Sequence, residues 1–204
     1  MTLNRFRQAL GRLAYRCVMP LRRRRLRNRS VSIVSNDCYS SFMYQWYDMP
    51  FNSPFVGLFI LPDDYLSLLE HHERLDAPID ITAEGHEYPV GTLPTGERIH
   101  FLHYHTAEEA HDKWTRRLAR LDWDNCIVKF SENNGCSPEH IRRFGRLPYR
   151  DKVVFTCGRY PDVKCAVYLS EFAGEHQLGK YWKLADLHYN LGRHADRLQP
   201  GRQT

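Results

Sequence analysis

A cysteine in a polar turn is the side chain of this 204-residue sequence best placed for covalent chemistry. A β-branched run predicts a strand over Val31–Ser35 and the next segment predicts a helix over Tyr39–Tyr47, so Cys38 stands where that helix begins. A thiol at a helix N-terminus has its thiolate favoured by the helix dipole and by nearby N–H groups. Cys38 is therefore the candidate nucleophile. Two alternatives stay open: Cys38 lines a binding site, or it packs as a small apolar residue.

Two histidines are the candidate bases for this thiol. His103 and His105 stand at the end of a predicted strand, where period-two alternation places both imidazoles on one side. Either imidazole can complete a Cys–His pair with Cys38, and Asp37 or Glu132 can orient the ring. In the alternative interpretation the two histidines only close the strand.

A second polar turn, residues 131–136, precedes another predicted helix. Its Asn134-Gly135 pair favours a tight turn with positive φ, whereas the functional interpretation is a contact with a sugar or a phosphate. Ligands of open α/β sheets gather at the carboxyl ends of strands, provided that the strands are parallel neighbours. The residues predicted to bind ligand at the two turns are Ser35, Asn36, Glu132, Asn133 and Cys136.

The sequence gives no cofactor prediction and no metal prediction. It contains neither a Gly-rich phosphate loop nor a dinucleotide fingerprint. His103 and His105 can point together, but they lack two further ligands at a recognisable spacing.

Charge divides the chain into an arm and a domain. Residues 1–29 contain ten arginines and no acid, whereas the remaining 175 residues hold 19 basic and 24 acidic side chains. The six cysteines lie far apart without a C-x-x-C pair, which favours a reducing cytoplasm over a secreted disulfide scaffold. We expect a basic arm over residues 1–29, a single α/β domain over 30–196 and a frayed tail over 197–204.

The arm has the pattern of a basic amphipathic helix. Steps of three and four residues place one apolar stripe along it, with arginines around the rest: Phe6, Leu10, Leu13, Cys17 and Leu21. Such a helix can lie on an anionic membrane surface, and the stripe is too short and interrupted to span a bilayer. We therefore expect a cytoplasmic protein, peripheral at the inner membrane through residues 1–29. The alternatives are a nucleic-acid-binding arm, which the stripe disfavours, and a disordered tail.

Short apolar runs that alternate with helical patterns predict one mixed β-sheet with helices on both faces. Residues 93–97 read as a hairpin turn, so part of this sheet is antiparallel. Asp63, Thr106, Ser137 and either Ser40 or Ser41 are the predicted helix N-caps. The predicted strands are 31–35, 55–60, 79–83, 88–93, 98–103, 125–130 and 152–156, and the predicted helices are 39–47, 64–75, 107–121 and 138–144.

Five separate, ordered blocks carry a family resemblance. The chain resembles the bacterial exopolysaccharide-biosynthesis proteins of domain-of-unknown-function family 1919 from about residue 26 to about residue 190. The family's opening block SNNCWG appears here as SNDCYS, with Ser40 in place of the glycine. The blocks are LRNRSVSIVSNDC at 26–38, YPVG at 88–91, IHFLHYH at 99–105, AHDKW at 110–114 and LPYRDKVVF at 147–155.

The resemblance implies a mixed α/β sandwich and a role in surface-polysaccharide synthesis. With the two polar turns, it leads us to expect a transferase that acts on a sugar precursor or a lipid-linked glycan. Acyl transfer is favoured over glycosyl transfer, because a Cys or Ser turn with histidine suits acyl chemistry. The alternatives are a glycosyltransferase-type enzyme and a non-catalytic glycan-binding or assembly protein of the same machinery.

Overall fold

The computed structural model describes residues 3–85 and 87–198. A parallel sheet of four strands forms its centre, in the order β1 (Ser32–Ser35), β5 (Cys126–Ser131), β6 (Lys152–Thr156) and β7 (Ala166–Tyr168). Every residue of β1 and β5 is buried, as expected for central strands covered on both faces.

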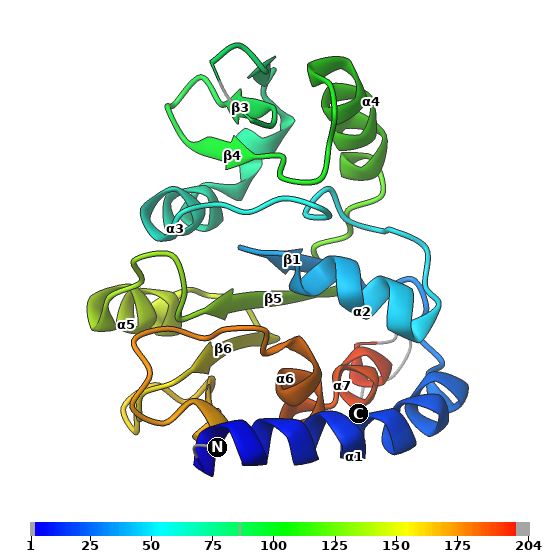
Figure 1. The fold of residues 1–204 in the computed structure, drawn as a ribbon. Coiled ribbons are helices and arrows are strands. Elements are labelled where there is room, and N and C mark those ends of the chain that lie inside the picture. The colour runs from blue at the N-terminus through cyan, green and yellow to red at the C-terminus, as the bar shows by residue number, and fades with distance from the viewer. Residues whose placement is uncertain (1–2, 86, 199–204) are drawn as a thin grey trace.

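Helices cover both faces of this sheet (Figure 1). Alternate residues of each strand enter two separate cores, one with Val34, Val128 and Val154 and the other with Ile33, Ile127 and Val153. The helices are α1 (Leu3–Arg25), α2 (Tyr39–Tyr47), α3 (Pro62–Glu70), α4 (Ala107–Leu118), α5 (Pro138–Arg146), α6 (Trp182–Tyr189) and α7 (Leu191–Arg197), with short 3-10 helices η1 (His72–Asp76) and η2 (Ser170–Phe172).

A second, antiparallel sheet lies beyond α3, with α4 beside it (Figure 1). It contains β2 (Asp80–Thr82), β3 (Val90–Thr92) and β4 (Arg98–His100) in sequence order. A Cβ added at Gly91 in β3 would stand 2.5 Å from the end of the Ile79 side chain and 2.9 Å from the buried Phe101 ring, so a larger residue there would displace both. The expected α/β class with an N-terminal helix is confirmed, and the parallel and antiparallel pairings occupy two sheets.

Local signals located most elements. Helix α2 and strand β6 have the predicted bounds, and Thr106 and Ser137 cap α4 and α5 through their side chains. Asp63 is not a cap, because α3 begins one residue earlier with Pro62 at its first position. Ser40 and Ser41 lie inside α2, which takes Cys38 as its N-cap residue.

Other predictions of secondary structure were wrong or missing, mainly where an element depends on contacts with segments far away in the chain. The run 55–60 forms no strand and contributes one bridge, Phe59 to His100. The predicted helix 64–75 breaks at His71 into α3 and η1. Strand β7 and helices α6 and α7 went unpredicted. Helix α7 continues through Arg197, and residues 199–204 of the expected tail lie outside the described residues.

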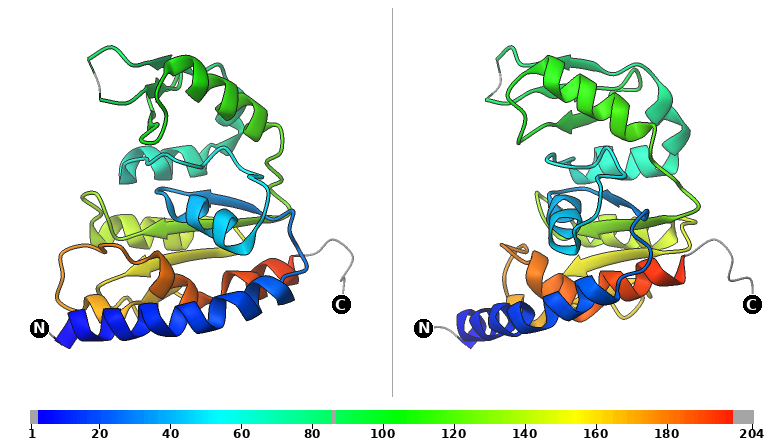
Figure 2. Two further views of the ribbon diagram at one scale, coloured as in Figure 1. Left: turned by 45° about the vertical axis from the view of Figure 1, so that its right-hand side comes forward. Right: turned by 90° about the vertical axis from the view of Figure 1, so that its right-hand side faces the viewer.

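The N-terminal helix packs along the domain and is not a detached arm (Figures 1 and 2). Asn4 and Gln8 donate hydrogen bonds to the carbonyl oxygens of Ala173 and Glu171, at 2.8 and 2.9 Å. Further along, Tyr15 is buried and Arg22 pairs with the fully buried carboxylate of Asp186 at 3.2 Å. The face of α1 that carries Asn4, Gln8, Tyr15 and Arg22 therefore packs on the domain. Among the described residues, no helix is long and apolar enough to cross a membrane.

Candidate functional site

The carboxyl ends of β1 and β5 meet because the two strands are parallel neighbours, with Ser35 opposite Lys129. The turn after β1 therefore lies against the carboxyl end of β5. This pair of strands meets the condition for a ligand site at the sheet edge, namely that the strands are parallel neighbours. Asn36, Asp37, Lys129, Ser131 and Tyr181 form one buried polar cluster there, which we call the strand-end cluster.

Asp37 is the centre of the strand-end cluster. Its Oδ1 accepts hydrogen bonds from Lys129 Nζ at 2.7 Å and from the Tyr39 amide at 2.9 Å. Its Oδ2 accepts from Tyr181 and Ser131 hydroxyls at 2.7 and 2.9 Å. Burial alone raises the pKa of Asp37, but the Lys129 charge and these hydrogen bonds outweigh it and hold the pKa below its ordinary value. The carboxyl group is therefore ionised at neutral pH.

Lys129 is fully buried in the middle of the apolar strand β5. Its ammonium lies 5.4 and 5.2 Å from the ring centroids of Tyr39 and Tyr181. Burial lowers the pKa of Lys129 to about 8, with the charge of Asp37 acting in the opposite direction. Both partners are thus charged near pH 7, and the lysine is close to losing its proton.

Asn36 contributes an amide to the same cluster. Its Oδ1 accepts from Lys129 Nζ at 3.1 Å and lies 3.2 Å from the Ser131 hydroxyl. Its Nδ2 is buried and has no hydrogen-bond partner within residues 3–85 and 87–198. Ser35 stabilises the turn by donating to the Asp37 carbonyl oxygen at 2.9 Å. Within the described residues, this amide N–H₂ is the polar group of the cluster without a hydrogen-bond partner.

Cys38 lies beside this cluster, but its surroundings oppose a thiolate. Its Sγ is 3.8 Å from the Leu58 carbonyl oxygen, and the side chain is buried. Burial, with the Asp37 charge as the second cause, raises the pKa of Cys38 to about 11, whereas the helix dipole predicted a lowered value. The dipole-based expectation is corrected in this respect. The nucleophilic role of Cys38 stays a prediction without support from its environment.

The two histidines lie in a turn that packs against Gly57, where the His103 amide donates to the Gly57 carbonyl oxygen at 3.0 Å. Strand β4 ends at His100, so His103 and His105 fall in the following turn, where strand alternation no longer applies. Both are exposed, and no interaction within the described ranges joins either ring to Cys38. The described residues thus show no interaction between either imidazole and the Cys38 thiol, and the Cys–His pair stays a prediction.

Glu132 connects β5 to the turn after β6. Its Oε2 accepts from the amides of Cys157 and Gly158 at 2.7 and 3.1 Å, and its Oε1 accepts from the Tyr160 hydroxyl at 2.7 Å. Glu132 thus orients backbone rather than an imidazole. Burial raises the pKa of the neighbouring Cys136 thiol to about 12.

The turn at 133–135 has the conformation that its sequence favours. Asn134 and Gly135 both take positive φ, at 53° and 79°, so the structural interpretation of this pair is confirmed. The buried Oδ1 of Asn133 has no partner among the residues described.

Sequence reasoning missed three members of the strand-end cluster, Lys129, Ser131 and Tyr181, and one acidic triplet. Lys129 had a signal, since a lysine inside a buried apolar strand requires a counter-ion. Tyr181 had none, because it comes from a segment 144 residues beyond Asp37. The D-x-D triplet Asp122-Trp123-Asp124 precedes β5 at the opposite sheet edge, where Asp122 accepts from the Asp124 amide at 3.0 Å and closes a turn. Across the part of the chain described, no three metal-binding side chains come together.

The fold and this cluster define an α/β protein with a polar site at the carboxyl edge of a parallel sheet. A basic N-terminal helix packs against the helices on one side of that sheet. The chain belongs to the family defined by the domain of unknown function DUF1919, whose model matches residues 12–198. It is 35% identical over 163 residues to an uncharacterised protein of Haemophilus influenzae, a match that covers 79% of each chain. The family match includes the second half of α1, so this part of the helix is part of the family's common region.

Proposed function

We propose that this protein works at an anionic membrane surface in exopolysaccharide synthesis, as a transferase that acts on a sugar precursor or a lipid-linked glycan. The observation that carries the proposal is the outer face of α1. Five of the seven large hydrophobic side chains that are exposed in the described chain belong to this helix: Leu3, Phe6, Leu10, Leu13 and Leu21.

The orientation of α1 supports a membrane-facing role. The face with Asn4, Gln8 and Arg22 contacts the domain, which leaves the apolar stripe outside, where it costs free energy unless something covers it. Exposed arginines flank the stripe, among them Arg5, Arg7 and Arg16. An apolar stripe bordered by arginines is the arrangement of helices that lie in the headgroup layer of a bilayer.

The strand-end cluster supports the transferase part of the proposal. A lysine with a pKa of about 8, hydrogen-bonded to a carboxylate that is held ionised, can release and take up a proton near neutral pH. Transfer to a sugar hydroxyl needs such a group, because the hydroxyl must lose its proton as the new bond forms. We place the reaction at Asp37 and Lys129 for either acyl or glycosyl transfer.

The second candidate is a non-catalytic glycan-binding or assembly protein of the same machinery. It is favoured by the burial of the strand-end cluster, since the side chains of Lys129 and the residues Asn36, Ser131 and Tyr181 are fully covered. In this alternative the cluster fixes the relation between β1, β5 and α6, and α1 brings the protein to the membrane.

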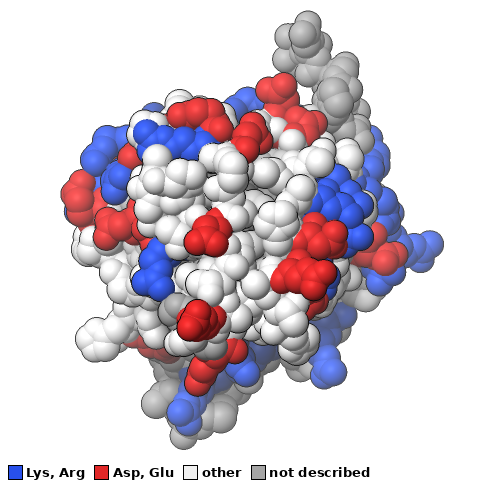
Figure 3. Space-filling model, turned by 90° about the horizontal axis from the view of Figure 1, so that it is seen from above, with Lys and Arg blue, Asp and Glu red and all other residues white. Residues whose placement is uncertain are grey.

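Vesicle co-sedimentation of the full chain tests the membrane part. Wild-type protein should sediment with vesicles of phosphatidylglycerol and phosphatidylcholine, and the variant Leu10→Asp/Leu13→Asp should stay in the supernatant. These leucines are 57% and 58% exposed, so the variant should keep the wild-type fold. The matched control is Leu61→Asp/Leu102→Asp, two leucines that are 41% exposed outside α1. The upper face of the molecule carries both acidic and basic groups (Figure 3), whereas α1 contains basic residues and no acidic one. Equal sedimentation of all three proteins would contradict the proposal.

Polysaccharide output and bound molecules test the reaction. In a strain deleted for this gene, a plasmid copy of the wild type or of the exposed-residue variant Leu61→Asp should restore surface polysaccharide. Copies carrying Asp37→Asn or Asn36→Ala should restore less of it. Mass spectrometry of small molecules that co-purify with the native protein separates the chemistries: coenzyme A supports acyl transfer and a nucleotide sugar supports glycosyl transfer. Full output from folded Asp37→Asn protein would favour the assembly role.

A further inference from the structure

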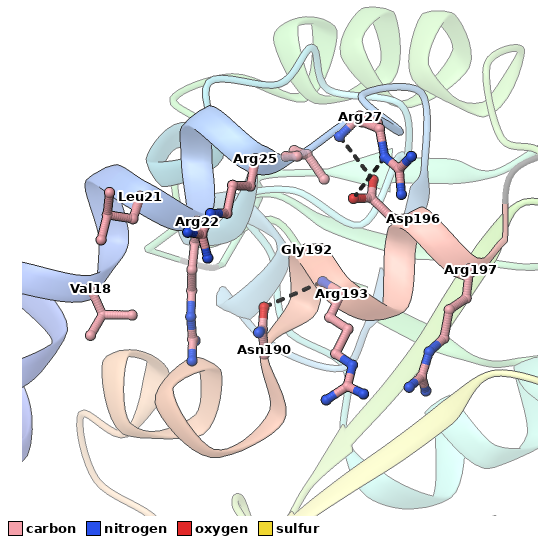
Figure 4. Close-up of a pocket in the computed structure, with 11 residues that line it drawn as sticks. Val18, Leu21, Arg22, Arg25, Arg27, Asn190, Gly192, Arg193, Asp196 and Arg197 are labelled. Carbon is pink, nitrogen blue, oxygen red and sulfur yellow. Dashed lines mark hydrogen bonds and ion pairs between the residues drawn. The ribbon is translucent and has the colours of Figure 1, made fainter.

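A groove of about 780 Å³ lies between the last turns of α1 and helix α7 (Figure 4). Apolar side chains of α1, Val18 and Leu21, form one part of its wall. The charged part contains five arginines and one acid: Arg22, Arg25, Arg27, Arg193, Arg197 and Asp196. The groove is therefore strongly cationic.

Counting the ion pairs shows which arginines are already used. Arg22 pairs with Asp186, and its guanidinium also donates to the Leu187 carbonyl oxygen. Arg27 faces Asp196, whose Oδ1 accepts from the Arg27 amide at 2.8 Å. Arg25, Arg193 and Arg197 form no ion pair with any residue of the described chain. Three guanidinium groups thus line one groove without a counter-ion.

The arginines of α7 are arranged to act together. Arg193 and Arg197 are four residues apart and extend from the same side of the helix, as Figure 4 shows. Their field is felt locally: burial lowers the pKa of His194, and the charges of Arg197 and Arg193 lower it further against the opposing charge of Asp151. Guanidinium groups bind phosphate oxygens through paired N–H donors, so this arrangement suits a multiply charged phosphate better than a single carboxylate.

We propose that this groove binds a phosphate or diphosphate group, of the kind carried by lipid headgroups and lipid-linked sugars. Leu21 belongs both to the groove and to the exposed apolar stripe of α1, so the groove opens beside the face assigned to the membrane. The inference that the groove binds phosphate depends only on its arginines. That the phosphate is presented by a membrane lipid rests on the proposed function.

Calorimetric titration of the full chain with inorganic pyrophosphate is the first test. Wild-type protein should bind it saturably, and Arg193→Gln/Arg197→Gln should lower the affinity about tenfold or more, because two charge-assisted contacts are removed. The matched control is Arg116→Gln/Arg120→Gln, an exposed pair with the same sequence spacing in the last turn of α4 and the turn that follows it, which should bind like wild type. Circular dichroism and thermal melting of each variant establish that it is folded.

A vesicle arm identifies the source of the phosphate. Vesicles containing phosphatidic acid, a phosphate monoester, are compared with phosphatidylglycerol vesicles of equal surface charge. A preference for phosphatidic acid that Arg193→Gln/Arg197→Gln removes supports a lipid headgroup, and groove-dependent pyrophosphate binding without that preference supports a soluble phosphate.

The proposal is overturned if neither probe distinguishes the groove variant from wild type, or if Arg116→Gln/Arg120→Gln loses as much binding as the groove variant. Leu10→Asp/Leu13→Asp leaves the groove intact, so pyrophosphate binding by that variant stays at the wild-type level even where vesicle binding fails. The two proposals can therefore fail separately.

Discussion

The outer face of α1 and the strand-end cluster invert the usual distribution of polarity in opposite ways. On α1, leucines stand in solvent among arginines, whereas in the cluster a lysine and an aspartate are enclosed in the core. Each arrangement costs free energy when taken alone. In the strand-end cluster the Asp37–Lys129 pair offsets the cost of burying the two charges. On α1 no part of the described chain covers the apolar stripe. The two charged side chains of the strand-end cluster thus satisfy one another, whereas the exposed stripe of α1 is the surface for which we propose a membrane partner.

The two regions also differ in how they respond to change. Removing one member of a closed cluster leaves its partner buried and uncompensated, but replacing an exposed leucine leaves the fold intact. The predictions below use this difference, beginning with the largest expected loss of stability.

Lys129→Met should be the most damaging substitution. It leaves the Asp37 carboxylate buried without its counter-ion, so we expect a loss of about 3–5 kcal/mol in the free energy of unfolding. Urea denaturation measures it. The double variant Lys129→Met/Asp37→Asn removes both charges and should recover part of the loss. If the single variant is as stable as wild type, the cluster is not the compensated pair described here.

Acid should weaken the same region. The folded-state pKa of Asp37 lies below its unfolded value, so the unfolded chain binds the proton more readily as the pH falls. The stability that Asp37 contributes is present above its unfolded pKa of about 3.9 and is lost as pH falls from there through the folded value. Unfolding free energies between pH 5 and pH 2 should decline less steeply for Asp37→Asn than for wild type. Parallel curves for the two proteins would contradict the assignment.

Arg22→Gln tests the inner side of α1 and should have an intermediate effect. The substitution removes the charged partner of the buried Asp186, whose pKa is already raised by burial. We expect a loss of about 1–3 kcal/mol in the free energy of unfolding. Arg16→Gln, on the exposed part of the same helix, is the control and should change stability by less than about 0.5 kcal/mol. Equal effects of the two would mean that α1 is not anchored by its polar face.

His103→Gln and His105→Gln should have the smallest effects on stability. Both rings are exposed in a turn, so each change should shift the free energy of unfolding by less than about 0.5 kcal/mol. Their role in polysaccharide output stays a prediction, and the complementation assay described for Asp37→Asn measures it. Reduced output from folded variants would support a functional role for these histidines.

The sequence by itself determined the features that depend on neighbours in the chain. The steps of three and four residues in α1 placed its apolar stripe, and the Ser137-Pro138 start of α5 was predicted from capping chemistry alone. The polar turn after β1 was also located, because a β-branched run that ends in small polar residues is a local signal.

Tertiary structure decided which of these features meet. Strand order joined Asn36 and Asp37 to Lys129 and Ser131, and the distant Tyr181 completed the hydrogen bonds of Asp37. It also placed the histidine turn against Gly57, next to the residue that Cys38 contacts, and packed one face of α1 on the domain, which left the apolar stripe outside. Periodicity and capping arise from contacts within about one helical turn, whereas strand order and the choice of packed face arise from burial shared between segments far apart in the chain.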